Sequence, residues 1–359
     1  MEIRVYTPEL NLLGIVENFS SLLWDRKYSE AGRFELHVPV MADTVNYLKR
    51  GNIIAYEGAV EAGVIESIVA EQGKNNQLTI SGRFLESYLD RRLIYINGST
   101  LNGVSHTFNF SGRVEVGMRT LISNAVAIPL LQLGTLHGFT EEITFQATFQ
   151  NLLRYESQLA NSAGFGFRCI PDFVNKTITF DVYKGLDHSE NQSNRVRVIF
   201  SDDYRNLANT TYTENDQLLK NVCYVGGQGE GEDRVWVLVG DDTLTGLARR
   251  EVKLDATDIQ PDDLTTEQYK AKLTQRGEDL LNNEDILIKS FECDTMPTGN
   301  FIYKEHYDLG DIVTVKKEQW GVSLDLRITE ITEVYEHGKA VISPIFGNPL
   351  PDTVSWEDK

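Results

Sequence analysis

A glycine-rich run at residues 225–234 (VGGQGEGEDR) has the composition most suggestive of chemistry in this chain. Glycine-rich turns cradle phosphates when a helix N-terminus follows them, or when a Lys-Ser/Thr pair completes the motif. Here the apolar run 235–239 follows instead, and its composition predicts a strand. The run also carries Glu230, Glu232 and Asp233, whose charges would repel phosphate. We therefore predict a glycine-rich hairpin loop and no nucleotide site.

Four glycines of this run have two interpretations. Glycine adopts backbone conformations with positive φ at little cost, so a tight hairpin loop alone could require them. Glycine also lets another backbone approach closely, which makes the same positions candidate interface residues. The sequence leaves both interpretations open for Gly226, Gly227, Gly229 and Gly231.

Metal-ligating residue types are present without metal-ligating spacing. The six histidines form neither an HExxH motif nor an i, i+4 pair. The three cysteines, Cys169, Cys223 and Cys293, lie too far apart for a CxxC motif, so we expect reduced and mostly buried thiols. Acidic clusters such as residues 255–258 lack the spacing of a calcium loop. No metal or cofactor site is predicted, although a structural calcium ion between distant loops stays open.

Catalytic motifs are also missing from the sequence. No G-x-S-x-G elbow occurs, because the run from Gly321 to Ser323 lacks the final glycine. A glycosidase needs two carboxylates about 5–9.5 Å apart, and with 53 acidic residues some pair will always satisfy that distance. We predict no catalytic residues and no enzyme activity.

Composition narrows the class of protein further. The 359 residues suggest about two or three domains, and 41% hydrophobic residues suit a folded chain. The net charge of −19 argues against binding nucleic acid or anionic lipid, both of which need a basic surface. Residues 1–9 do not have the order of a signal peptide, and no apolar stretch reaches the length of about 18 residues that spans a membrane.

The first hundred residues are typical of a small barrel or sandwich. Residues 21–28 alternate, with Leu22, Trp24, Arg26 and Tyr28 on one face, and residues 34–38 alternate again after a glycine-containing turn. This pattern predicts a β-hairpin with Trp24, Phe34 and Leu36 in the core. A short helix at 41–50 and further strands follow it. Those strands are expected at 52–57, 60–70 and 77–81.

The middle of the chain reads as a compact α+β module. A loop-rich joint at residues 97–103 precedes it. Apolar residues at helical spacing predict one helix at 114–126 and a second at 148–162, with Gly164 placed to end the second. Residues 165–170 and 177–183 then predict a hairpin.

Strands return in the last part of the chain, with one helix among them. Thr265 is a candidate N-cap, and Gln268 completes a capping box for a helix at about 265–282. His337 and Gly338 form the expected turn of the last hairpin. The predicted strands are 195–200, 206–213, 221–226, 234–239, 249–255, 285–293, 311–316, 324–335 and 339–346.

Several segments carry a resemblance that composition and periodicity do not supply. Examples are TISGRFLESYLDRR at 79–92, YDLGDIVT at 307–314 and RITEITE at 327–333. The full set comprises residues 17–39, 79–92, 180–187, 220–234, 249–255, 307–314, and 327–333 with 344–347. In their order and separation they resemble the siphovirus tail-hub proteins of phages and prophages of Gram-positive bacteria. Leu186 departs from the family, which often has a charged or polar residue there.

The resemblance implies a fold and an assembly. The fold would be α+β but mainly β, with two tail-tube-like β-barrel domains and a mixed domain between them. We place the first barrel at 1–97, the α+β insertion at 98–200, and the second barrel with its helix at 201–359. Three copies would form a homotrimeric, pseudo-sixfold ring that joins the tail tube to the tip. The chain ends at Lys359, so we expect a hub without a further hydrolase or fibre domain.

The resemblance also implies partners and a location. The partners would be other copies of the chain, the distal tail protein or tail tube, the tape-measure protein, and tip-fibre or receptor-binding proteins. The location would be the virion tail tip, after assembly in the host cytoplasm. Acidic residues facing the lumen would keep passing DNA from binding, and simple solubility explains the charge equally well.

Three arginines are candidates for contacts between subunits, because arginine suits interfacial carboxylates. They are Arg83, Arg91 and Arg92, and pairing within the chain explains them equally well. Two other functions compete with the structural hub. The 35 aromatic residues would suit a carbohydrate-binding, receptor-recognising module, and the third alternative is a cell-wall hydrolase.

Overall fold

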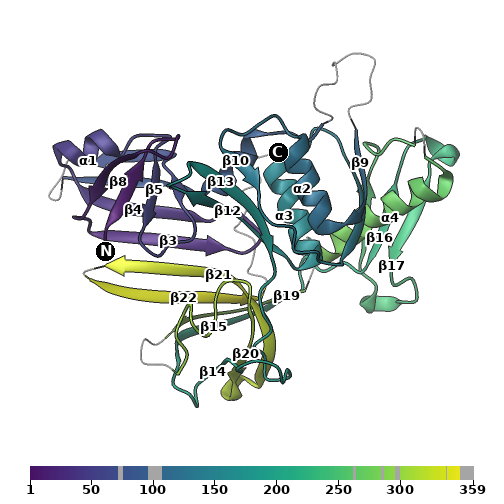
Figure 1. Cartoon of the computed structure of the whole chain (residues 1–359). Coiled ribbons are helices and arrows are strands. Elements are labelled where there is room, and N and C mark those ends of the chain that lie inside the picture. The colour runs from purple at the N-terminus through teal and green to yellow at the C-terminus, as the bar shows by residue number, and fades with distance from the viewer. Residues whose placement is uncertain are drawn as a thin grey trace.

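The computed structural model describes residues 1–71, 76–95, 107–261, 264–283, 287–295, 300–336 and 338–347. Strands dominate, and within these residues they pair into five sheets (Figure 1). The chain is therefore mainly β with a smaller helical part, as the sequence predicts. The pairing leaves every one of these sheets open, so the two closed barrels expected from the resemblance are not found in the single chain.

The N-terminal hairpin is confirmed. β3 (Ser21–Lys27) pairs with β4 (Arg33–Pro39), and the register sets Trp24 opposite Phe34 and Leu22 opposite Leu36. All four side chains are buried. The predicted helix is short, α1 (Ala42–Tyr47). Two strands extend the hairpin on its β4 side, β8 (Gln77–Arg83) and then β7 (Ser67–Glu71).

A second, four-stranded sheet packs against this one. Its order is β2-β1-β5-β6, and the two sheets share one core in which Ile3, Val5 and Ile54 meet Trp24 and Leu36. Trp24 is thus a core residue, as predicted, in a sandwich of two open sheets. The strands of the second sheet are β1 (Ile3–Tyr6), β2 (Leu12–Val16), β5 (Ile53–Tyr56) and β6 (Gly63–Val64).

The middle part contains both predicted helices, α2 (Val114–Asn124) and α3 (Leu152–Ala163). Gly164 ends α3 with φ 67°, in the left-handed region that favours glycine. The predicted hairpin is β12 (Gly166–Asp172) with β13 (Thr177–Tyr183). The other elements here were not predicted from the sequence pattern. They are η1 (Leu85–Arg91), β9 (Phe108–Arg113), β10 (Leu131–Leu133) and β11 (Glu142–Ala147).

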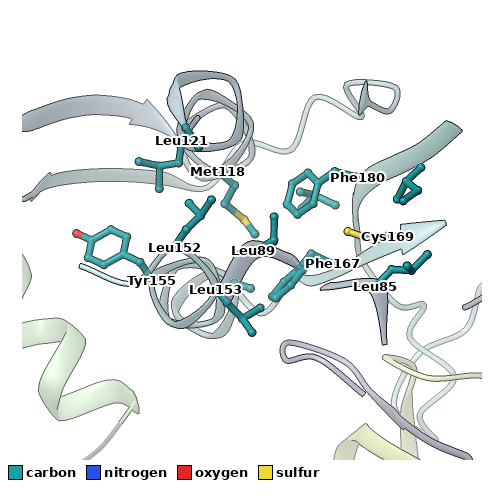
Figure 2. Packing of buried hydrophobic residues seen from close by; sticks show 14 of the residues in the cluster. Leu85, Leu89, Met118, Leu121, Leu152, Leu153, Tyr155, Phe167, Cys169 and Phe180 are labelled. Atoms are coloured by element: carbon teal, nitrogen blue, oxygen red, sulfur yellow. The ribbon is translucent and has the colours of Figure 1, made fainter. Parts of the chain in front are cut away.

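The core of this middle part spans several elements (Figure 2). Leu85 and Leu89 of the 3-10 helix η1 pack with Met118 of α2, Leu152 of α3 and Phe167 of β12. The cluster also reaches back into the N-terminal region. The predicted joint at residues 97–103 lies outside the described residues.

The C-terminal strands join the N-terminal sheet. β21 (Val322–Glu336) pairs with β22 (Lys339–Gly347) on one side and with β3 on the other, so the ten-stranded sheet combines strands from the N-terminal and C-terminal parts of the chain (Figure 1). Gly338 occupies the turn of the last hairpin with φ 75°, while His337 lies outside the described residues. The remaining elements are β14 (Ile199–Ser201), β15 (Leu207–Asn215), β19 (Ile288–Thr295), β20 (Ile312–Lys317) and η4 (Glu318–Trp320).

A small module in the second half of the chain packs against the middle part, where Lys272 of its helix donates to the Phe145 carbonyl (3.1 Å). Its helix α4 (Thr266–Asn283) begins with the predicted capping box, because the Gln268 N–H donates to Thr265 Oγ1 (3.2 Å) and the Thr265 N–H donates to Gln268 Oε1 (2.9 Å). The helix covers one face of a three-stranded sheet in the order β17-β16-β18. The other elements are β16 (Val222–Gly226), η2 (Gly231–Asp233), β17 (Trp236–Gly240), η3 (Gly246–Ala248) and β18 (Glu251–Asp255).

Candidate assembly interfaces

The seam between β3 and β21 joins the N-terminal and C-terminal parts of the chain. Seven residue pairs align along it, from Glu330 opposite Lys27 to Glu336 opposite Ser21. Beside the backbone ladder, Thr332 donates its hydroxyl to Asp25 (3.0 Å), whose other oxygen accepts from Arg33 (3.0 Å). This seam joins the N-terminal and C-terminal strands into one sheet.

Arg26 of β3 lies buried beside the seam, with its side chain 2% exposed. Its guanidinium donates to both oxygens of Glu61, at 2.7–3.1 Å, and to Asp308 Oδ1 and the Tyr303 hydroxyl, each at 2.6 Å. Burial by itself would lower the pKa of Arg26, but Glu61, Tyr303 and Asp308 outweigh burial and hold that pKa well above its ordinary value. Arg26 thus stays charged and ties β3 to two distant loops.

Glu333 of β21 is the second buried charge at the seam, with no exposed surface. Hydroxyl groups of Tyr56, Tyr303 and Tyr335 donate to its carboxylate, and Lys304 Nζ lies 3.4 Å away. Burial acts to raise the pKa of Glu333, while Lys304 and the three hydroxyls more than offset it and lower the pKa. The network therefore holds a carboxylate ion in place and suits a structural joint.

The three predicted interface arginines have partners within the chain. Arg83 forms a bidentate pair with Glu66 (both 3.0 Å) and also contacts Asp90 (3.0 Å). Arg91 stacks over the ring of Tyr88, and Arg92 donates to three backbone carbonyls. The ion pair of Arg83 with Glu66 lies at the start of β7, because Glu66 immediately precedes that strand. Arg83 therefore stabilises the end of the ten-stranded sheet that β7 forms.

The glycine-rich run is a hairpin loop between β16 and β17, as predicted. Gly229 (φ 104°) and Gly231 (φ 55°) have the positive φ that the loop was expected to need. A Cβ at Gly226 would lie 2.6 Å from the Arg234 guanidinium, and one at Gly227 would lie 2.3 Å from the Tyr269 hydroxyl. All four glycines thus have a reason within the chain itself.

Local sequence patterns did not indicate which strands end the ten-stranded sheet. These are β7 and β15, together with β14 on the branch through β20. Among the described residues, β7 pairs only with β8 and β15 pairs only with β19, so each strand has one unpaired edge. Residues 67–70 of β7 are all exposed, including Ile68 (37%) and Val69 (47%). An exposed apolar edge strand is a ready template for pairing with another chain.

Comparison with known proteins identifies the family. The siphovirus ReqiPepy6 Gp37-like protein family matches residues 2–348 of the chain. The chain belongs to this family. It is a structural protein of a phage tail, and the resemblance seen in the sequence segments is confirmed. None of the curated proteins matches it.

Solved structures show the same fold at low sequence identity. The 43 kDa tail protein of prophage MuSo2 from Shewanella oneidensis is 14% identical with a TM-score of 0.58, over 97% of this chain and 99% of that one. The tail protein from Neisseria meningitidis MC58 has the same identity and score, with 96% of each chain covered. Prophage tail protein gp18 from Listeria monocytogenes EGD-e is 14% identical with a TM-score of 0.55, over 99% and 97%.

The described residues also bear on metal sites and membrane spans. No group of three or more His, Cys, Asp or Glu side chains there could hold a metal ion. None of the helices in that part of the chain is both long and apolar enough to cross a bilayer. All three cysteines are buried thiols, as predicted.

Proposed function

We propose that this tail protein is the hub of a siphophage tail tip. In this role three copies form a pseudo-sixfold ring between the tail tube, or a distal tail ring, and the tip. Residues 1–97 and 201–359 supply the two tube-like β units of each copy, and residues 98–200 form the α+β unit between them. The proposal rests on membership of the siphovirus tail family and on the fold shared with prophage tail proteins.

The ten-stranded sheet is the observation that carries this proposal. It continues across the seam from β7 in the N-terminal part to β15 in the C-terminal part. Apart from a branch through β20 that ends at β14, the sheet ends in two unlike edges, β7 and β15. It can therefore pair head to tail, with β7 of one copy against β15 of the next. Head-to-tail contacts form a closed ring when the rotation between copies is right. Pairing of this kind would also cover both exposed edges and continue the β wall around the ring.

The proposed ring would pass DNA through its centre. A net charge of −19 suits such a conduit, because an acidic wall repels phosphate and lets DNA slide. The neighbours in the tail would be the distal tail protein or tail tube, the tape-measure protein, and tip-fibre or receptor-binding proteins. A structure of the assembled ring with a neutral or basic inner wall would contradict the conduit.

Cross-linking in assembled tails tests the ring directly. Val69→Cys on β7 and Thr211→Cys on β15 place one thiol on each free edge, and the native cysteines are buried. A flexible bis-maleimide should then give products of one, two and three chains and nothing larger. The largest product should have three times the 40.6 kDa mass of the chain.

Single-thiol variants are the controls for this experiment. Head-to-tail pairing brings unlike edges together, so neither Val69→Cys nor Thr211→Cys alone should cross-link. Val174→Cys combined with Thr211→Cys is the matched control, because Val174 is 88% exposed on the turn between β12 and β13 and lies on neither edge strand. Dimers from Val69→Cys alone, or no three-chain product in intact tails, would overturn the proposed ring.

A further inference from the structure

The sheet of the α4 module has two different faces. On the inner face, Cys223, Val225 and Val239 pack against Tyr269 and Leu273 of α4. Side chains alternate along a strand, so the neighbouring positions point away from the helix. In Figure 1 the module lies at the opposite end of the molecule from the N-terminal sheets. Its outer face therefore has no described element covering Trp236 or Leu238, which are 45% and 39% exposed.

The strand register places the outer residues in rows. One row sets Leu238 of β17 beside Tyr224 of β16, with Lys253 of β18 on the other side. The next row is Trp236, Gly226 and Asp255 in the same strand order. Tryptophan, tyrosine and arginine are the residues most enriched where protein interfaces concentrate their binding energy. Here two of them share one exposed face with a leucine.

Arginine completes this set, and Gly226 makes the space for it. The Arg234 guanidinium lies over Gly226, donates to the carbonyls of Gly226 and Gly227, and pairs with Asp255. Its central carbon also lies 4.7 Å from the centre of the Trp236 ring. These contacts hold the tryptophan in place before any partner arrives, which reduces the entropy cost of binding.

Charge selects the kind of partner. The cations of this face already have anions: Arg234 and Lys253 contact Asp255, and Arg249 contacts Asp242 and Glu251. The adjoining loop adds Glu230, Glu232 and Asp233. None of these three forms an ion pair within the described part of the chain, and η2, which holds the last two, has no buried residue. An apolar, aromatic centre with unpaired acid at its border is complementary to a basic partner.

We propose that the outer face of the β17-β16-β18 sheet is a docking surface for a basic protein segment. The segment would carry lysine or arginine together with apolar side chains. It would place the apolar groups on Trp236 and Leu238 and the cations toward the acidic loop. Among the described strands, β17 and β18 each pair only with β16, so their outer sides could also accept an extended chain. None of these residues lies on β7 or β15, so the inference does not depend on the proposed ring.

A labelled peptide tests this surface with the full-length protein. The probe is a short synthetic peptide in which lysine alternates with leucine and phenylalanine. Its binding is followed by fluorescence anisotropy. Trp236→Ser should weaken binding at least about tenfold, as expected for a central aromatic anchor. A peptide with glutamate in place of lysine should bind at least about tenfold more weakly, and added salt should weaken the lysine peptide.

Trp320→Ser is the matched control, because Trp320 is 46% exposed and lies on η4 outside the module. It should change peptide affinity less than about twofold. A double change of Glu230→Lys and Glu232→Lys on the exposed loop tests the charge without touching the sheet, and it should also weaken binding. Equal binding of both peptides, or equal losses in the two tryptophan variants, would overturn the proposal. Binding of purified cell-wall glycan that requires Trp236, without peptide binding, would overturn the choice of partner.

Discussion

Two glutamates, both without exposed surface, lie in opposite environments in this protein. Glu333 at the β3–β21 seam accepts from three tyrosine hydroxyls and lies beside Lys304, and these partners lower its pKa. Glu156 on α3 has no hydrogen-bond partner for either oxygen within the described residues, and burial raises its pKa well above the ordinary value. The pKa values of the two acids are therefore shifted in opposite directions.

Glu86 resembles Glu156 more than Glu333. It lies on η1, and one oxygen accepts from the Cys169 N–H (2.6 Å) while the other has no partner among the described groups. Burial raises the pKa of Glu86 to about 8. The Cys169 thiol lies near both acids, and burial followed by Glu86 and Glu156 raises its pKa as well. The comparison teaches that partners, and not depth, decide whether a buried acid in this fold carries charge.

The largest expected effect comes from breaking the charged seam. Arg26→Met removes the cation and leaves Glu61 buried without its partner, so the free energy of unfolding should fall by about 3–5 kcal/mol. Urea unfolding at pH 7 measures this change. Arg4→Met is the matched control, because Arg4 contacts Glu57 at 3.9 Å on the surface, and it should cost less than about 1 kcal/mol. Similar losses in both variants would contradict the seam as the joint of the two parts.

The next largest effect is a pH dependence of the free energy of unfolding that comes from Glu86. A raised folded-state pKa means that the stability due to Glu86 is complete below its unfolded pKa of 4.5 and is lost as pH rises through about 8. Glu86→Gln keeps an acceptor for the Cys169 N–H and cannot ionise. The free energy of unfolding of the variant relative to the parent should therefore rise by about 2–4 kcal/mol between pH 5 and pH 9.

Glu142→Gln controls for the loss of one surface charge, because Glu142 is exposed at the start of β11. Its stability relative to the parent should stay flat with pH. Chemical denaturation at each pH provides the measurement for both variants. A Glu86→Gln curve parallel to that of the parent would show that Glu86 is already ionised or solvated in the folded protein.

Local patterns were predictable from the sequence. Alternation located the β3–β4 hairpin, and the spacing of Thr265 and Gln268 located the start of α4, because each signal lies within a few residues. The predicted start of α3 at residue 148 was too early by four residues. Asn151 caps the helix instead, since its side chain accepts from the Arg154 N–H, and Phe149 before it has φ 59°.

The network of buried charges at the β3–β21 seam could not be predicted from local patterns, because its members are far apart in the chain. Arg26 pairs with Glu61, 35 residues away, and with Asp308, 282 residues away. One signal was present: Arg26 falls on the same strand face as Leu22 and Trp24, and a charge on a core face needs a buried partner. The register of β21 against β3, which decides that partner, is set by tertiary packing and not by local sequence.

The smallest expected effect tests whether Lys304 or the three tyrosine hydroxyls keep Glu333 ionised. Lys304 leads the contacts that lower the Glu333 pKa, so Lys304→Met should raise that pKa and move acid unfolding to higher pH. The stability due to an ionised Glu333 is lost as pH falls through its folded-state pKa. In the Lys304→Met variant this loss should therefore begin at a higher pH, and the free energy of unfolding near pH 4 should fall by about 1 kcal/mol. Lys289→Met is the control, because Lys289 and its partner Glu214 are both exposed. If the two acid-unfolding curves coincide, the three tyrosine hydroxyls alone keep Glu333 charged, and the seam depends on hydrogen bonds and not on this ion pair.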